Sequence, residues 1–335
     1  MSNKKIIAVV GSTGNQGGSV AETFLALPEW HVRGLTRDPT KPSASTWKEK
    51  GVELVSGDLN SVESLTGAFS GANVIFGTTD FWGHMQDPSV QEEAKTRGIT
   101  PNEVSYEREV QQAKNIVDAA AANIATLDRF VMSAINDSKY WSKGKITFNL
   151  HFESKWRAIE YLQEKYPALW EKTSLLQVGF YASNWKTTGV SLPKKTDKDG
   201  EYVLSMPMGG DSKVAIVDVN GDTGNFVKAL VALPPKVNLI GAGSKISWKE
   251  YAAIWGQVNN VSVSFTSYPA SVLEEQMGSA GKELGEMFTY IDEFGYDGGD
   301  PSVIYPWEVK EKYGIDVKYT TMEEYIAKQD YSAYL

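Results

Sequence analysis

The sequence predicts a doubly wound α/β fold of the Rossmann type, in which helices cover both faces of a parallel sheet and a smaller α/β lobe follows toward the C-terminus. Three observations support this prediction. The apolar run Ile6–Val10 has no polar alternation, as expected of a central strand covered on both faces. Further strand-like runs alternate with helical patterns. Glycines spaced three residues apart follow the first run directly.

The strands of the predicted sheet are short apolar or β-branched runs bounded by turn residues. In chain order they are Ile6–Val10, His31–Thr36, Glu53–Ser56, Val74–Gly77, Arg129–Ser133 and Thr173–Val178. Five helices fit between these strands. The first is expected over Ser19–Leu27, and the clearest over Glu103–Ala122, where an apolar stripe is combined with charged residues.

The character of the chain changes after Tyr181. A polar, turn-rich stretch is followed by apolar runs at Val214–Val219 and Val237–Ile240. Helical patterns then cover Trp248–Gln257, Ser271–Gly295 and Thr321–Lys328. We therefore expect a Rossmann core over residues 1–185, to which 212–242 returns, and a smaller lobe built from 186–211 and 243–335.

The glycine-rich turn after the first strand is typical of dinucleotide-binding proteins. Gly11 permits a tight turn, Gly14 lets backbone N–H groups approach a pyrophosphate, and Gly17 lets the next helix pack closely on the strand. The alternative is a glycine-rich turn that binds nothing, but a strand before it and a helix after it favour a nucleotide site. Other residues expected to bind the cofactor in this loop are Thr13, Asn15 and Gln16.

The end of the second strand distinguishes NAD from NADP, because an acidic residue there would bind the ribose 2′-hydroxyl of NAD. This chain has Arg37, whose guanidinium can pair with a 2′-phosphate and stack on adenine, and Lys41 follows closely. Asp38 leaves two interpretations open, since it could bind the ribose of NAD or cap the turn at Pro39. We favour NADP(H) as the cofactor.

Composition restricts the classes of function. The chain has 335 residues, is 41% hydrophobic and carries a net charge of −9. Its length and hydrophobic content are sufficient for one large domain, or for a Rossmann core with a smaller lobe. Because its Lys and Arg residues are scattered, we expect no direct binding to nucleic acid. The chain has no cysteine, and no cluster of histidine and acidic residues has the spacing of metal ligands, so we expect no metal site.

The N-terminus has Lys4 and Lys5 before five apolar residues, which is too short for the core of a signal peptide. No run approaches the length of a membrane span. We therefore expect a soluble protein of the cytoplasm, with the nucleus as a second location, and no membrane partner.

Several segments together resemble the NmrA-like family of the atypical short-chain dehydrogenase/reductase superfamily. The resemblance covers nearly the whole chain and rests on Val10–Gly18, Leu35–Pro39, Gly57–Leu59, Thr78–Trp82, Ile216–Val219 and Ser247–Tyr251. It implies NADP(H) binding and a two-lobed shape, and it leaves the activity open. It also implies that Asp58 and Leu59 lie on the adenine side, and that the nicotinamide ribose is bordered by Thr78, Thr79 and Asp80.

Catalysis in the wider superfamily uses a tyrosine as general acid, a lysine four residues later and a serine at the end of the fifth strand. In this sequence His151 stands at the tyrosine position, Lys155 is retained and Ser133 fills the serine position. His151 and Lys155 share one helical face. His151 is either a proton donor to a developing alkoxide or a residue that transfers nothing after the loss of the tyrosine. Lys155 is expected to bind the cofactor in both cases.

Large aromatic residues follow the fourth, fifth and sixth strands, where an open parallel sheet binds its ligands. Those expected to line a substrate pocket are Phe81, Trp82, Trp141 and Trp185, with Phe180 and Tyr181 beside the cofactor. Tyr140 or Tyr181 could replace the missing tyrosine as proton donor. The alternative is that these side chains pack the interface between the lobes.

Two hypotheses of function follow. The first is an NADPH-dependent reductase of a hydrophobic or aromatic carbonyl or conjugated compound. The second is a redox sensor that binds NADP(H) without turnover and regulates a protein partner, which requires different affinities for the two cofactor states. A third hypothesis, a purely structural α/β module, is disfavoured because it would leave the glycine-rich loop and Arg37 without a function. The sequence leaves the oligomeric state open.

Overall fold

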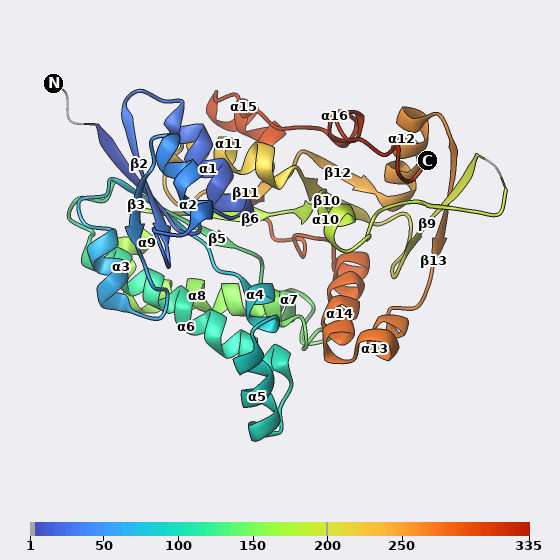
Figure 1. Cartoon of the computed structure of the whole chain (residues 1–335), viewed down its shortest axis with the longest axis horizontal. Coiled ribbons are helices and arrows are strands. Elements are labelled where there is room, and N and C mark those ends of the chain that lie inside the picture. Colours follow the sequence, from blue (N-terminus) through green and yellow to red (C-terminus); the bar gives the residue numbers. More distant parts are fainter. Residues whose placement is uncertain (1–3, 199) are drawn as a thin grey trace.

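A parallel sheet forms the centre of the molecule (Figure 1). The computed structural model describes residues 4–198 and 200–335. The strands of the sheet are β1 (Lys5–Val9), β2 (Trp30–Thr36), β3 (Glu53–Ser56), β4 (Val74–Gly77), β5 (Arg129–Ala134), β6 (Thr173–Val178), β11 (Asn238–Gly241) and β14 (Val303–Ile304). These eight strands lie in the order β14-β11-β6-β5-β4-β1-β2-β3, and every neighbouring pair is parallel. The chain order reverses between β1 and β4, so the predicted doubly wound sheet is confirmed.

The six strands expected from the sequence are β1 to β6, and β3, β4 and β6 have the predicted bounds. The first strand is apolar after Lys5 because it supplies both faces of the sheet. Ile7 and Val9 pack into one layer, and Ala8 and Val10 pack into the other.

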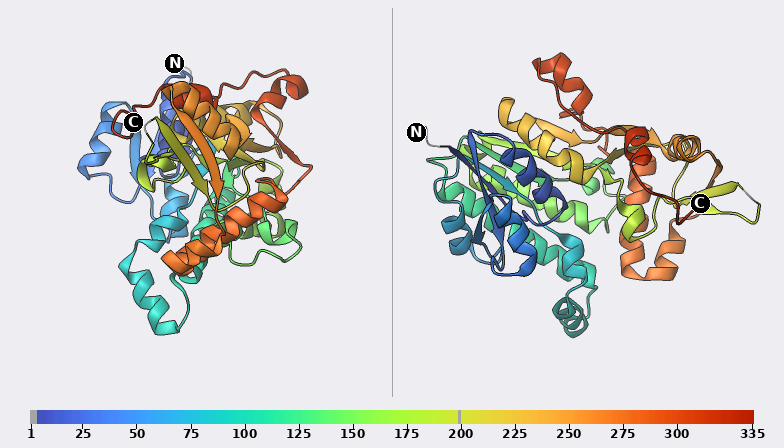
Figure 2. Two further views of the ribbon diagram at one scale, coloured as in Figure 1. Left: turned by 90° about the vertical axis from the view of Figure 1, so that its right-hand side faces the viewer. Right: turned by 45° about the horizontal axis from the view of Figure 1, so that its top comes forward.

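Helices cover both faces of the sheet (Figure 2). On one face lie α1 (Asn15–Leu25), α11 (Val219–Ala232) and α15 (Pro306–Tyr313), which bury Phe24, Phe226 and Val309. On the other face lie α3 (Val62–Ala68), α6 (Pro101–Ala122) and α8 (Leu150–Lys165), which bury Leu65, Ile116 and Ile159. The shorter α2 (Pro42–Glu49) and α9 (Pro167–Trp170) extend the two layers.

Two helices begin earlier than the sequence predicts. Helix α1 starts directly after Gly14, four residues before the predicted start at Ser19, and its first turns include glycines that have low intrinsic helix propensity. Helix α6 starts at Pro101 because Thr100 and Glu103 form a capping box around a proline in the first turn.

The second lobe contains two small sheets and an aromatic core. One three-stranded sheet is β12-β10-β7 and the other is β13-β9-β8; their strands are β7 (Phe180–Tyr181), β8 (Lys194–Lys195), β9 (Glu201–Met206), β10 (Lys213–Val217), β12 (Ser244–Ser247) and β13 (Ser262–Ser267). Helices α10 (Asn184–Thr187), α12 (Trp248–Asn259) and α16 (Met322–Ala327) accompany them. Large rings fill the space between these elements, among them Trp248, Trp255, Phe288 and Tyr290.

The predicted helix Ser271–Gly295 is broken into α13 (Ser271–Met277) and α14 (Ser279–Phe294). Gly278, with φ of 60°, turns the chain between them. A Cβ atom on Gly281 would lie 1.8 Å from the carbonyl oxygen of Leu273, so only glycine allows α13 to fold back this closely on α14.

The chain crosses between core and lobe more often than the expected division indicates. Strand β14 and helix α15 lie in the segment 243–335, yet they join the main sheet and one of its helix layers. Strand β10 lies in the segment 212–242, yet it pairs with β7 and β12 of the lobe. A two-residue strand such as β14 has no periodicity that a sequence can reveal.

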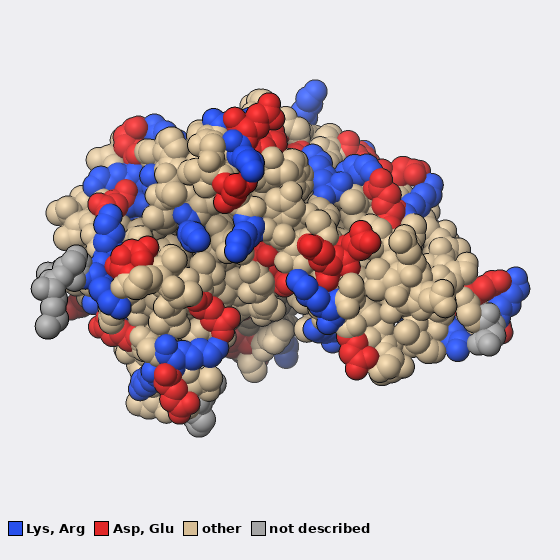
Figure 3. Space-filling view, turned by 90° about the horizontal axis from the view of Figure 1, so that it is seen from above, with Lys and Arg blue, Asp and Glu red and all other residues tan. Residues whose placement is uncertain are grey.

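Helices α4 (Phe81–Met85) and α7 (Ser138–Trp141) follow the carboxyl ends of β4 and β5, and α5 (Pro88–Arg97) packs against α6 and projects from the molecule (Figure 1). Acidic and basic residues are interspersed over the face seen in Figure 3. Within the described part of the chain, no helix is both long and apolar enough to cross a bilayer.

Candidate functional site

The glycine-rich turn lies where the strand order reverses, between the carboxyl ends of β1 and β4. Gly11 has φ of 64°, and a Cβ atom on Gly17 would lie 2.2 Å from the carbonyl oxygen of Gly11. Gly17 therefore has to be glycine for α1 to approach the turn. Gly14 is the N-cap of α1 and provides no side-chain cap, so N–H groups of the first turn are available to an anion. Thr13 and Asn15 beside it are exposed.

Gln16 links the glycine-rich turn to two other predicted site residues. Its Nε2 donates to the hydroxyl of Tyr181 at 2.8 Å, and its Oε1 accepts from the hydroxyl of Ser133 at 2.8 Å. Burial raises the pKa of Tyr181 to about 12, which makes its hydroxyl a weak acid. Residues of α1, β5 and β7 are thus brought together, and the hydroxyl of Ser133 is bound to Gln16 rather than to His151.

Arg37 at the end of β2 is exposed and forms no ion pair or hydrogen bond within the described residues. Asp38 caps the turn, because its Oδ1 accepts from the N–H (2.8 Å) and hydroxyl (2.6 Å) of Thr40. These hydrogen bonds lower the pKa of Asp38. Lys41 is exposed at the start of α2. The guanidinium of Arg37 is therefore available for an anionic ligand, whereas Asp38 is engaged locally.

The predicted adenine-side residues form local turns. Oδ1 of Asp58 accepts from the N–H of Asn60 at 2.9 Å, and the carbonyl of Leu59 accepts from Asn115 on α6 at 2.8 Å. The side chain of Asp58 is exposed and that of Leu59 is half-buried.

The residues after β4 have three different surroundings. The methyl group of Thr78 lies 3.5 Å from the position that a Cβ atom on Gly11 would take. The hydroxyl of Thr79 donates to Glu109 at 2.7 Å. Asp80 caps α4 by accepting from the N–H of Gly83 at 3.0 Å. Thr78 therefore borders the glycine-rich turn, and Thr79 leads into the buried centre of the site.

Lys155 is buried and its ammonium group binds the carboxylate of Glu109, a fully buried residue of α6. Glu109 also accepts from the hydroxyls of Thr79 and Ser154. Both charges are thus removed from water and compensate each other. Sequence reasoning missed Glu109, because nothing in the helical pattern of α6 distinguishes it from the other charged residues there.

His151 is buried at the start of α8 and is held by a second carboxylate. Its Nδ1 lies 2.7 Å from Oε1 of Glu283, and its N–H donates to the same oxygen at 2.8 Å. Glu283 is fully buried and belongs to α14 of the lobe. The imidazole also contacts the rings of Phe81 and Trp82, with centroids 5.9 and 5.2 Å away. Sequence reasoning missed Glu283 as well, because nothing in the sequence connects it with His151.

The remaining aromatic candidates lie apart from this group. Tyr140 is 69% exposed and stacks edge-on against Trp141, whose ring packs against the core of the lobe. Phe180 is buried against Trp248. Trp185 is buried against the ring of Tyr331 at 4.6 Å. The interpretation in which these rings pack the lobe therefore describes Phe180 and Trp185.

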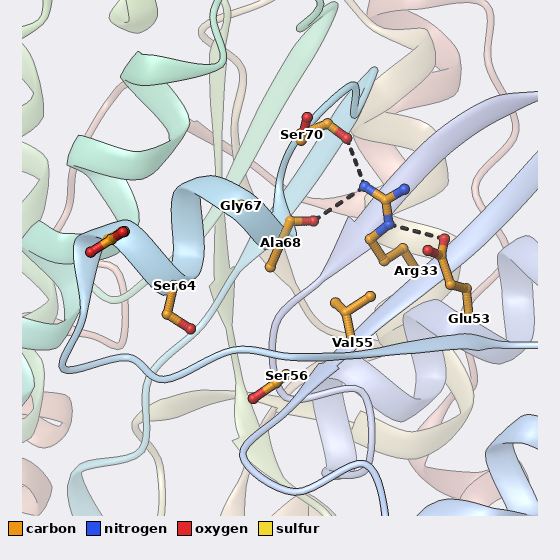
Figure 4. A pocket seen from close by; sticks show the side chains of 9 residues that line it. Arg33, Glu53, Val55, Ser56, Ser64, Gly67, Ala68 and Ser70 are labelled. Carbon is orange, nitrogen blue, oxygen red and sulfur yellow. Dashed lines mark hydrogen bonds and ion pairs between the residues drawn. The ribbon is translucent and has the colours of Figure 1, made fainter.

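A hollow lies along the edge strand β3, beside helix α3 (Figure 4). Arg33 in its wall donates to Glu53 at 3.0 Å and to the carbonyl oxygens of Ala68 (3.2 Å) and Ser70 (2.7 Å). None of the predicted site residues lines this hollow. In the ranges 4–198 and 200–335, no group of three or more His, Asp or Glu side chains could hold a metal ion.

The family of this chain follows from its sequence. The profile of the NmrA-like family matches residues 3–326. This chain belongs to the NmrA-like family. The match extends from the first strand to the part of the lobe that contains Glu283, so the family model covers both lobes of this NmrA-like protein, and the resemblance expected from the sequence is confirmed.

Similar proteins include oxidoreductases and a regulator. The NmrA-like family domain-containing oxidoreductase FrzB of Cladobotryum sp is 27% identical over 242 residues, which are 70% of this chain and 66% of FrzB. The chain therefore matches slightly less than two thirds of that relative's length.

Solved structures that share the fold of this NmrA-like protein include a regulator and a reductase. NmrA, a negative transcriptional regulator, in complex with NADP has a TM-score of 0.71 and 18% identity over 99% of this chain and 97% of that chain. The leucoanthocyanidin reductase–NADPH complex from Vitis vinifera has a TM-score of 0.65 and 15% identity over 96% of this chain and 98% of that chain.

Proposed function

We propose that this NmrA-like protein is an NADPH-dependent reductase of a hydrophobic or aromatic carbonyl or conjugated compound. The observation that carries the proposal is the buried imidazole of His151, which contacts Phe81 and Trp82 on one side and a buried carboxylate, Glu283, on another. An ionisable group in such surroundings can donate a proton next to an apolar substrate. Oxidoreductases among the relatives support the same class of reaction.

The residues of the glycine-rich turn fit NADP(H). The N-terminus of α1 has no side-chain cap and can receive the pyrophosphate. Because Gly17 has no side chain, α1 approaches Gly11 closely and its first N–H groups lie at the turn. Arg37 has no protein partner in the described chain and can pair with the 2′-phosphate. NADP in the structure of NmrA and NADPH in leucoanthocyanidin reductase support this choice of cofactor.

Bound NADPH supplies the hydride. His151 then gives the proton on its Nε2 to the oxygen or carbon that becomes basic in the substrate, while Nδ1 stays bound to Glu283. The imidazole is reprotonated from solvent after each turnover. Phe81 and Trp82 would exclude water and offer an apolar surface to the substrate. Lys155, on the same face of α8 as His151, would hold the cofactor ribose by a hydrogen bond from an ammonium group whose charge Glu109 compensates.

Replacing His151 with phenylalanine tests this function. We expect NADPH consumption with acetophenone, benzylideneacetone or phenanthrenequinone in the wild type, and a loss of about 100-fold or more in kcat in the variant, as for removal of a general acid. The dissociation constant of NADPH should change little. A variant that reduces these compounds as fast as the wild type would contradict the role of His151.

Replacing Arg37 with alanine tests the choice of cofactor. The loss of a charge-assisted pair with the 2′-phosphate should weaken NADPH binding by about 10- to 100-fold. Binding of NADH, which has no 2′-phosphate, should change little. Titration calorimetry with both cofactors measures the difference, and equal losses would rule out the assignment of Arg37 to the 2′-phosphate.

The second candidate is a sensor that binds NADP(H) without turnover and regulates a protein partner. The observation that favours it is the missing tyrosine, together with an ion pair that already engages Lys155 with Glu109. It requires that NADPH and NADP⁺ bind with different affinities. Discrimination between the two in calorimetry, with no compound reduced, would favour the sensor.

A further inference from the structure

Helix α14 of the lobe fixes the start of α8 through two carboxylates one turn apart. Glu286 accepts from the N–H groups of Thr147 at 2.7 Å and Phe148 at 2.6 Å, and Glu283 accepts from the N–H of His151 at 2.8 Å. Asn149, the N-cap of α8, gives no side-chain cap of its own. Glu283 therefore binds a free N–H group in the first turn of α8, where the helix dipole favours an anion, and Glu286 binds two N–H groups of the residues just before the helix.

Glu283 differs from Glu286 because it also reaches the imidazole. Its Oε1 accepts from the backbone N–H of His151 and lies 2.7 Å from Nδ1, and its Oε2 accepts from the amide of Asn102 on α6 at 3.2 Å. A backbone N–H and an amide N–H can only donate, so the buried carboxylate acts as an acceptor on both oxygens. The proton of the neutral imidazole therefore belongs on Nδ1. Nε2 has no protein partner in the described residues.

We infer that Glu283 is a positioning residue for proton transfer by His151, an inference that rests on the proposed function. The carboxylate holds the imidazole in one orientation and one tautomer, and it compensates the positive charge when Nε2 is protonated. The proton that leaves Nε2 goes to the substrate, and the proton on Nδ1 stays on the ring. Since Glu283 belongs to α14, the lobe contributes directly to the proton donor of the core.

The tautomer of His151 can be measured without any substrate. The chain contains three histidines, so ¹⁵N-labelled histidine gives few signals, which His31→Gln and His84→Gln variants assign. We expect the neutral ring of His151 to carry its proton on Nδ1 in the wild type and in Glu283→Gln, whose amide oxygen still accepts. Glu283→Leu should lose this preference. Glu286→Gln, which removes a charge from the same helix without touching the ring, should keep it.

Kinetics with NADPH and benzylideneacetone, or whichever of the three compounds is reduced fastest, give the second readout. Glu283→Leu should lower kcat by roughly 100-fold and Glu283→Gln by roughly 10-fold, with the KM for NADPH unchanged, because the affected group acts in proton transfer. Glu286→Gln should stay within about twofold of the wild type, as expected for a substitution that leaves the ring in place. If Glu283→Leu does not fold, the tautomer of His151 in the wild type and the kcat of Glu283→Gln still test whether Glu283 positions the imidazole.

A wild-type His151 with its proton on Nε2 would overturn the inference, as would a Glu283→Leu variant that loses no more activity than Glu286→Gln. Failure of the proposed function gives a different result. In that case none of the compounds is reduced by the wild type, whereas the NMR spectra still report whether Glu283 holds the imidazole.

Discussion

Replacing Gly17 with alanine is expected to abolish measurable NADPH binding and to lower the thermal stability of the protein. The added Cβ atom would lie 2.2 Å from the carbonyl oxygen and 2.5 Å from the carbonyl carbon of Gly11. Backbone atoms cannot rotate away, so α1 has to move from the turn, at a cost of about 3 kcal/mol or more. The same movement would displace the N–H groups that we propose receive the pyrophosphate. Calorimetric titration with NADPH and thermal denaturation measure the two effects.

Gly67→Ala is the matched control for this substitution. Gly67 also lies within a helix, α3, but a Cβ atom there meets nothing within 4 Å. Alanine in an open helical position is expected to stabilise by up to about 1 kcal/mol and to leave NADPH binding unchanged. Wild-type affinity for NADPH in Gly17→Ala would mean that the glycine-rich turn does not hold the cofactor.

Replacing Glu109 with glutamine is expected to destabilise the fold by about 3–5 kcal/mol, because the ammonium of Lys155 would remain buried without a counter-charge. Denaturation by urea measures this loss. Combining the substitution with Lys155→Met removes both charges, and we expect the double variant to recover most of the stability.

Glu107→Gln on the same helix is the control for Glu109→Gln. Glu107 pairs with Arg97 at 2.6 Å, but both side chains are well exposed and the pair contributes little to stability. Equal stability of Glu109→Gln and Glu107→Gln would contradict a charged, buried Lys155–Glu109 pair.

Local features of the sequence were sufficient to predict the core of the fold. The apolar run at Ile6–Val10 and the glycine spacing after it identify a central strand and a nucleotide-binding turn, since both depend on neighbouring residues. The start of α1 was placed too late because Gly17 and Gly18 lower the helical signal where packing requires glycine. The break at Gly278 was missed because the flanking segments are both helical.

The candidate site depends on contacts between distant segments. Glu109 and Glu283 have no local signature, because each becomes important only when α6 or α14 packs on the start of α8. Aromatic residues after strands are equally ambiguous. Trp82 contacts His151, whereas Trp185 is buried against Tyr331 in the core of the lobe, and only the tertiary packing separates the two cases.

Reductase activity is tested most directly by hydride transfer from NADPH that carries deuterium at both C4 positions of the nicotinamide, with the product analysed by mass spectrometry. The test compounds are acetophenone and benzylideneacetone, whose reduced products keep the transferred deuterium on carbon, whereas a reduced quinone loses it to solvent. We expect one deuterium in the product formed by the wild type and a strongly reduced yield with His151→Phe. Tight binding of the labelled NADPH without deuterium in any product, across these and a broad set of hydrophobic carbonyl and conjugated compounds, would contradict the reductase and favour the sensor.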